Sequence, residues 1–354
     1  MLESSQLLFT AKDTRLRPNI STPRRTISVP NLLSSACDHV SRSLVIGSST
    51  TQLYRNLSYA LKFPAGSEII VSKIDHEANI ASWVDMAERH NLVLKWWLPK
   101  TKENPKLEAS DLSELLTEKT VMVTCTHASN ILGTIHDIPA IAEAVHKIPG
   151  ALLCVDAVAY APHRQIDVKA LGVDFYAFSW YKVYGPHVSM LYASDKGLEA
   201  TTPLSHYFNP QKTLQDKLGL AGSCYELTAS IPSVLNYFGP DPSISWAAIE
   251  KHEELLQGTL IKYLNARPDV TICGEKDSDP KKRVATISFV VKDRKSQDVV
   301  EDVDRLSSGN MGIRWGGFYS VRLLDEVLGL GRDGVVRVSM VHYNTCEFWI
   351  SQAG

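Results

Sequence analysis

The sequence lacks the features that mark several classes of protein. Its 354 residues carry a formal net charge of −2 at pH 7, so no positive excess favours binding to nucleic acid or to an anionic membrane surface. Its six cysteines are widely spaced and form no CxxC pair. This spacing argues against a disulfide framework or a zinc site and favours a reducing compartment. The longest apolar run, "ALLCVDAVAYAP", is interrupted by Asp156 and is too short to span a membrane.

The first 30 residues lack the continuous apolar core of a signal peptide. They contain five basic and two acidic residues but little amphipathic periodicity. A transit peptide is therefore the less favoured alternative, and we expect a cytoplasmic location. The stretch "RPNISTPRRTISVPN" contains three prolines, and we expect residues 1–45 to form an irregular N-terminal segment.

Apolar strand-like and helix-like segments alternate from residue 43 onward. Strands are predicted at 43–47, 67–73, 92–99, 120–127, 151–158 and 174–180. Helices are predicted between them, at 51–63, 79–91, 110–118 (opened by Ser110 as N-cap), 138–148 and 167–172. This alternation predicts an α/β fold built from βαβ units around a mostly parallel sheet. The strands are nearly continuous apolar runs, which is typical of a sheet covered on both faces.

The pattern changes near residue 245. "SWAAIEKHEELLQGTLIKYLNAR" predicts a long amphipathic helix, and the strands and helix that follow it predict a smaller α+β domain. We therefore expect a large domain over 46–243 and a small C-terminal domain over 244–354. The segment "GLGRDG" (329–334) matches GxGxxG, but it follows a helix and precedes a strand, so we interpret it as a turn in which Gly329 or Gly331 ends the helix.

Polar residues follow the ends of the predicted strands, where ligands bind in open parallel sheets. The stretch "GSSTT" (47–51) opens a helix and could hold a phosphate, although such stretches are more often simple N-caps. His76, Asn130, Asp156 and Lys182 follow the later strands. Taken alone, the histidine is more often a packed residue and the aspartate a helix cap or half of an ion pair. A zinc site of the HExxH type is excluded because isoleucine holds its second histidine position.

Lys182 stands in "DFYAFSWYKVYGPH", at the end of a strand that reads as buried. A buried ammonium loses its charge or finds a partner, and a neutral amine can condense with an aldehyde. Pyridoxal 5'-phosphate (PLP) needs a lysine for its aldehyde, a helix N-terminus for its phosphate and a carboxylate for its ring nitrogen. The strand ends supply all three, so the sequence predicts a PLP site and no metal site.

Four segments strengthen this prediction: "IDHEANIASW", "HASNILGTIHDI", "VDAVAYAPHRQIDVKALGVDFYAFSWYKVYGP" and "VVRVSMVHYNT". They resemble the fold-type I, class V aminotransferase family, in its cysteine desulfurase-like branch, over Gly47–Thr345. The pattern also resembles fungal specialised-metabolism members of this branch, such as the loline-pathway PLP enzyme. The resemblance implies a fold-type I PLP-dependent transferase, with an amino-acid substrate and a homodimer with shared active sites.

The resemblance also implies roles for individual residues. Lys182 would form the internal aldimine, and Asp156 would pair with the pyridinium nitrogen. His76 would stack on the ring and relay protons, and Asn130 would approach the ring hydroxyl or the substrate carboxylate. Arg337 would hold the substrate α-carboxylate as a two-pronged donor.

The phosphate contacts implied by the resemblance come from both subunits. Thr50, Thr51 and Ser179 would contact the phosphate, and the hydroxyl of Tyr181 could reach it. Tyr181 stands where the family usually has histidine. Gly222-Ser223 would be the counterpart of the segment that the partner subunit contributes.

Two departures from the family bear on the reaction. Ala159 replaces the glutamine that donates to the ring oxygen. The loop "IRWGGFYSVRLL" has Tyr319 or a neighbour where desulfurases carry their nucleophilic cysteine, and no cysteine lies between Cys273 and Cys346. We therefore predict a PLP enzyme that acts on an amino acid through an external aldimine, by lyase, aminotransferase, epimerase or decarboxylation and bond-forming chemistry, without desulfurating cysteine. The alternatives are a desulfurase that uses another cysteine and a non-catalytic scaffold.

Overall fold

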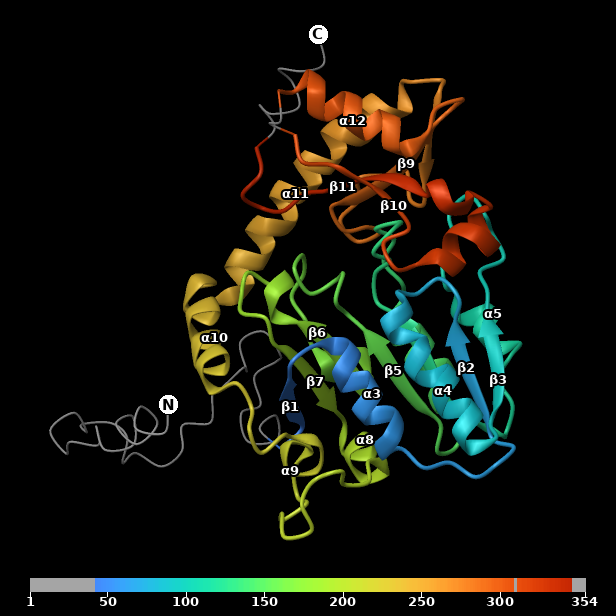
Figure 1. Ribbon diagram of the computed structural model, residues 1–354, viewed down its shortest axis with the longest axis vertical. Coiled ribbons are helices and arrows are strands. Elements are labelled where there is room, and N and C mark those ends of the chain that lie inside the picture. The colour runs from blue at the N-terminus through green and yellow to red at the C-terminus, as the bar shows by residue number, and fades with distance from the viewer. Residues whose placement is uncertain (1–41, 309–310, 346–354) are drawn as a thin grey trace, which may run out of the picture.

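The computed structural model describes residues 42–308 and 311–345. Two sheets organise the chain (Figure 1), and the strands of the larger one all precede those of the smaller one in the sequence. The larger sheet has seven strands in the order β1-β7-β6-β5-β4-β2-β3. The smaller has four strands in the order β10-β11-β9-β8. The division at residues 243 and 244 remains a prediction.

The seven-stranded sheet is mostly parallel, as the sequence predicted. Its strands are β1 (Leu44–Gly47), β2 (Glu68–Ser72), β3 (Val93–Trp97), β4 (Thr120–Thr126), β5 (Leu152–Asp156), β6 (Phe175–Ser179) and β7 (Ser189–Ala193). Strands β2 to β6 run parallel. Strand β7 is antiparallel to β6, and β1 is antiparallel to β7, so β1 runs in the same direction as β6. The carboxyl ends of β1, β2, β4, β5 and β6 therefore lie at one edge of the sheet.

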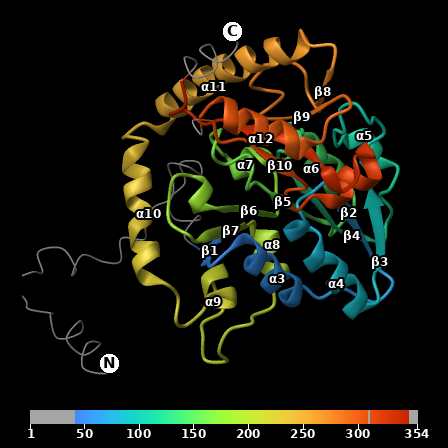
Figure 2. The ribbon, with the colours of Figure 1, turned by 45° about the horizontal axis from the view of Figure 1, so that its top comes forward.

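Helices cover both faces of this sheet (Figure 2). On one side lie α3 (Thr50–Ala60) and α4 (Ala81–His90), whose Leu57 and Trp83 pack in one buried cluster. On the other side lie α6 (Ile138–His146) and α7 (Val168–Leu171), whose Ile141 and Val168 belong to a second cluster. Because both faces are buried, the strands are continuously apolar rather than alternating.

Six further helical elements complete the large part of the chain, as far as the structure describes it. They are α5 (Ala109–Ser113), α8 (Asp195–Ala200), α9 (Leu214–Leu218), α10 (Tyr225–Tyr237), η2 (Glu77–Asn79) and η3 (Trp180–Lys182). The prediction of Ser110 as an N-cap was wrong, because α5 begins one residue earlier and Glu108 precedes it. The sequence also gave no prediction for β7, which follows Lys182 after a short turn.

The small part of the chain packs a helical layer on an antiparallel sheet. Its strands are β8 (Val270–Cys273), β9 (Thr286–Val291), β10 (Arg314–Gly316) and β11 (Val335–Ser339), and its helical elements are α11 (Pro242–Asn265), α12 (Ser296–Leu306), η4 (Leu323–Leu328) and η5 (Gly331–Asp333). Leu260, Ile287 and Val336 lie in its separate apolar core. Gly329 ends η4 with φ of 69°, so the interpretation of "GLGRDG" as a turn is confirmed.

Candidate active site

A pocket lies at the edge of the large sheet where the parallel strands end. Its lining residues are Ser49, Thr50, Thr51, His76, Ala78, Thr126, Asn130, Asp156, Val158, Ala159, Ser179, Tyr181 and Lys182. All eight residues that the sequence placed around the cofactor within one subunit are among them. Three other predicted site residues, Ser223, Tyr319 and Arg337, are not in the lining.

Lys182 and Asp156 form the electrostatic centre of this pocket. Lys182 ends η3, directly after β6, and Asp156 is the last residue of β5. Burial lowers the pKa of the Lys182 amine, an effect that the negative charge of Asp156 opposes. Burial raises the pKa of Asp156 to about 6, while the backbone N–H of Val158, 2.8 Å from Oδ1, and the charge of Lys182 act in the opposite direction. A buried amine with a lowered pKa is the form that condenses with an aldehyde.

His76 lies beside this pair in its neutral form. Its Nδ1 accepts a hydrogen bond of 3.1 Å from the backbone N–H of Ala78, as the N-cap of η2. The ring proton is therefore on Nε2. Burial, followed by the charges of Lys182 and Arg337, lowers the pKa of His76 to about 4. At neutral pH the imidazole can stack on a flat ring without adding positive charge to the site.

The N-terminus of α3 forms the polar end of the pocket. Ser49 caps this helix, and its hydroxyl accepts from the N–H of Gln52 at 3.1 Å. The hydroxyl of Thr50 lies 2.8 Å from that of Ser179, which lies 2.7 Å from that of Ser189. Free N–H groups in a first helical turn and a group of hydroxyls together favour an anion. This donor set suits a phosphate.

A loop of the small part of the chain closes over the opposite side. The side-chain N–H of Asn130 donates to the carbonyl oxygen of Phe318 at 3.0 Å, and the Ser320 hydroxyl donates to its Oδ1 at 3.0 Å. Phe318 and Tyr319 have φ of 45° and 62°, left-handed values that are costly for non-glycine residues and often occur at functional sites. The Tyr319 ring lies 5.2 Å from that of His76, with 75% of its surface exposed.

Two further contacts join this loop to the segment that carries His76. The backbone N–H of Glu77 donates to the carbonyl oxygen of Tyr319 at 2.8 Å. The guanidinium of Arg322 donates to both carboxylate oxygens of Glu77 at 3.2 Å. Tyr319 therefore lies on a loop that is held by contacts to both Asn130 and Glu77.

Arg337 reaches the same region from β11. Its Nη1 donates to the backbone oxygen of Asn130 at 3.0 Å, and its guanidinium lies 3.7 Å from the centre of the Phe318 ring. Its charge also lowers the pKa values of Lys182 and His76, so it acts on the pocket from outside the lining. Burial lowers the pKa of Arg337 to about 10, and the neighbouring Arg314 adds to this effect.

Ser223 lies in the connection between α9 and α10, outside the pocket. Its predicted role in a partner's site stays a prediction. Sequence reasoning did not find Ser189 or Thr126, and it included Ser49 only as part of the stretch 47–51. The serine of β7 could have been found only by recognising a strand directly after Lys182, which would have brought its hydroxyl beside β6.

No cysteine is in the pocket lining. Among the described residues, Cys125, Cys154 and Cys273 are buried, and burial raises the pKa of each thiol. Cys224 is exposed. Cys37 and Cys346 lie outside the described residues, so the alternative of a non-standard cysteine at position 346 stays open. Within the described ranges, no group of three or more potential ligands could hold a metal ion.

The arrangement of lysine, carboxylate, imidazole and anion-binding helix at the edge of a mostly parallel sheet defines a PLP enzyme of fold-type I. The model of the aminotransferase class-V family matches residues 43–347. The chain belongs to this family, as the sequence motifs indicated, and it is a PLP-dependent enzyme.

Two related proteins agree with this assignment. The chain is 55% identical over 304 residues to the aminotransferase-like protein FGM3 of Gibberella zeae, covering 86% of this chain and 75% of that protein. It is 41% identical over 313 residues to the cysteine desulfurase-like protein ustD of Aspergillus flavus, covering 86% and 70%. The expected placement in the cysteine desulfurase-like branch is thus confirmed.

A solved structure supports the fold. The apo structure of a cysteine desulfurase from Thermococcus onnurineus superposes with a TM-score of 0.78 at 22% identity, covering 91% of this chain and 79% of that one. At this identity the likeness concerns the fold alone. No helix in the described part of the chain is long and apolar enough to cross a membrane.

Proposed function

We propose that this protein binds PLP through Lys182 and acts on an amino acid by chemistry other than the release of sulfur from cysteine. The observation that carries the proposal is that Lys182 and the buried Asp156 line the same pocket, where their charges interact, and that this lining contains no cysteine. PLP, when bound, withdraws electrons from the α-carbon of the amino acid joined to it. The protein decides which bond at that carbon is weakened.

Asp156 would keep a proton on the ring nitrogen of the cofactor. Without the cofactor, burial holds its pKa near 6. A positive partner at Oδ2 would stabilise the carboxylate and lower this pKa, as for any buried ion pair. The hydrogen bond from Val158 fixes the orientation of the carboxylate.

Once the substrate has taken the place of Lys182 on the cofactor, the free amine of Lys182 would take and return a proton at the α-carbon. Its lowered pKa favours the neutral amine, which is the form that accepts a proton. His76 would stay neutral and lie against the ring. Arg337 would hold the α-carboxylate, because its guanidinium is already oriented by Phe318 and the backbone oxygen of Asn130.

The loop that bears Tyr319 supports chemistry other than desulfuration. Desulfuration needs a mobile thiolate that attacks the substrate sulfur. Here the corresponding position holds a phenol, on a loop bonded to Asn130 and Glu77. Tyrosine cannot carry sulfur as a persulfide, whereas its ring and hydroxyl can shape the wall of a larger substrate site.

We also propose a homodimer with shared active sites. The chain segment around Ser223 exposes a group of large aromatic side chains: Tyr207, Phe208, Tyr225 and Tyr237 are between 60% and 91% exposed. Such exposed apolar surface is typical of an interface. The resemblance to fungal enzymes of specialised metabolism leads us to propose a role of that kind.

Borohydride trapping tests the assignment of Lys182. The purified protein with PLP should be yellow, and reduction should fix the cofactor to the peptide that contains Lys182. The Lys182→Ala variant should lose this adduct, whereas Lys169→Ala, at an exposed lysine of α7, should keep it. A reducible adduct that persists in Lys182→Ala would overturn the proposal.

A further inference from the structure

Two arginines lie side by side on adjacent strands of the small sheet, next to the active site. Strands β10 and β11 are antiparallel, and Arg314 lies directly opposite Arg337. Residues opposite each other in an antiparallel pair project from the same face of the sheet. Like charges in this position destabilise the pair, so the arrangement calls for a negative partner.

The described part of the chain supplies no such partner. Arg337 donates to a backbone oxygen and stacks on Phe318, and it forms no ion pair with a described carboxylate. Arg314 is exposed and likewise has no ion pair among the described residues. Glu77, whose backbone contacts the loop, is already bound by Arg322 in a two-pronged contact. Asp156 lines the pocket itself and forms no ion pair with either arginine.

One arginine suffices for the α-carboxylate of a substrate. Arg337 is the one fixed by neighbours, while Arg314 reaches toward solvent on the same face. A second guanidinium beside the first therefore matches a second carboxylate on the same ligand, because guanidinium and carboxylate form strong two-pronged hydrogen bonds. A hydrocarbon or hydroxyl side chain would leave this charge without a partner.

We propose that Arg314 and Arg337 form a dicarboxylate site, in which Arg337 holds the α-carboxylate and Arg314 the side-chain carboxylate of an acidic amino acid. The inference rests on the proposed function and names its substrate class. It makes Arg314 a specificity-determining residue, because loss of its charge should affect acidic ligands and spare neutral ones of the same shape.

Calorimetric titration of the PLP-loaded protein with succinate and succinamate tests the pair. Neither ligand has an amine, so binding is measured without turnover, and the two differ by one carboxylate. We expect succinate to bind about tenfold more tightly, since a hydrogen-bonded charge contact at a partly exposed site contributes at the lower end of its usual range. This preference should shrink as salt rises.

Three variants and one control separate the contributions of the two arginines. Arg314→Ala should abolish the preference without changing the affinity for succinamate, and Arg314→Lys should keep part of it. Arg337→Ala should weaken both ligands. Arg305→Ala, which removes an exposed arginine of α12 paired with Asp302, should behave like the unmodified protein.

Equal binding of the two ligands by the unmodified protein, or a preference that survives in Arg314→Ala, would overturn the inference. If either occurs while borohydride still fixes the cofactor to Lys182, the proposed function stands and only the substrate class is wrong. If the cofactor does not attach to Lys182, the proposed function fails. In that case a preference for succinate that depends on Arg314 would still establish the dicarboxylate site.

Discussion

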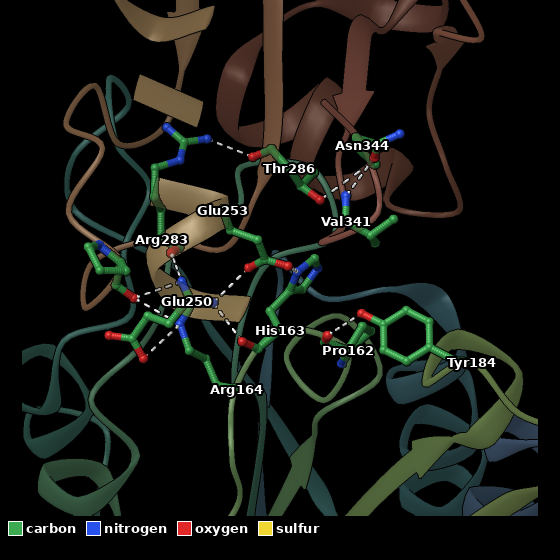
Figure 3. Close-up of polar contacts among 12 residues, drawn as sticks. Pro162, His163, Arg164, Tyr184, Glu250, Glu253, Arg283, Thr286, Val341 and Asn344 are labelled. Atoms are coloured by element: carbon green, nitrogen blue, oxygen red, sulfur yellow. Dashed lines mark hydrogen bonds and ion pairs between the residues drawn. The ribbon is translucent and has the colours of Figure 1, made fainter. Parts of the chain in front are cut away.

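Replacing Glu253 with alanine is expected to lower the free energy of unfolding, because Glu253 links the large and the small parts of the chain. Glu253 lies on α11, is fully buried, and joins two residues that follow β5 in the chain (Figure 3). Its Oε1 lies 2.7 Å from Nδ1 of His163, and its Oε2 lies 2.7 Å from Nη1 of Arg164. The same guanidinium donates to the backbone oxygens of Pro280 and Arg283 at 3.1 Å.

The magnitude follows from the burial of the whole cluster. Removing one partner of a buried ion pair costs about 3–5 kcal/mol of unfolding free energy, because the other charge is left without compensation. Glu250, whose Oε2 lies 3.7 Å from Nε of Arg164, can take over part of this compensation. We therefore expect a loss near the lower end, about 3 kcal/mol. The Glu253→Gln variant keeps the shape and one hydrogen-bond acceptor, so it should lose less than the alanine variant.

Urea unfolding followed by circular dichroism measures this loss. The matched control is Glu254→Ala, at the adjacent exposed position of α11, which should change the free energy by less than about 0.5 kcal/mol. A melting temperature lower by roughly 6 °C should accompany the loss in Glu253→Ala, at about 2 °C per kcal/mol for a protein of this size. If Glu253→Ala unfolds at the same urea concentration as Glu254→Ala, the cluster does not hold the two parts together.

Four other predictions concern the site and the assembly. Asp156→Asn should bind the cofactor but lose most turnover, since an amide cannot hold a proton on the ring nitrogen; near-normal activity would show that Asp156 has another role. Burial raises the pKa of Asp75 to about 8, above its unfolded value, so its contribution to stability is complete at low pH and is lost as pH rises through 8. Asp75→Asn should flatten this fall in urea titrations from pH 5 to 9, and an unchanged slope would contradict the assignment. With cysteine, PLP and a thiol reductant the protein should release no steady sulfide, and release that disappears in Cys346→Ser would establish a desulfurase. Sedimentation should show a dimer at assay concentration, whereas an active monomer would contradict the shared site.

The sequence by itself determined the components of the cofactor pocket. Strand propensity and apolar continuity are local properties, and parallel strands bring their carboxyl ends to one edge. The positions of Thr50, His76, Asp156 and Lys182 at or after the carboxyl ends of β1, β2, β5 and β6 were therefore enough to place them in one pocket. The order of the family motifs then identified the cofactor.

Only the tertiary structure decided which distant residues lie next to one another near the pocket. Strand β7 runs antiparallel to β6 and so places the hydroxyl of Ser189 beside those of Thr50 and Ser179, near the start of α3. The pairing of Arg314 with Arg337 depends on register, and a shift of one residue would place the two side chains on opposite faces. Such contacts depend on sheet order and register across long sequence separations, so no local pattern in the chain specifies them.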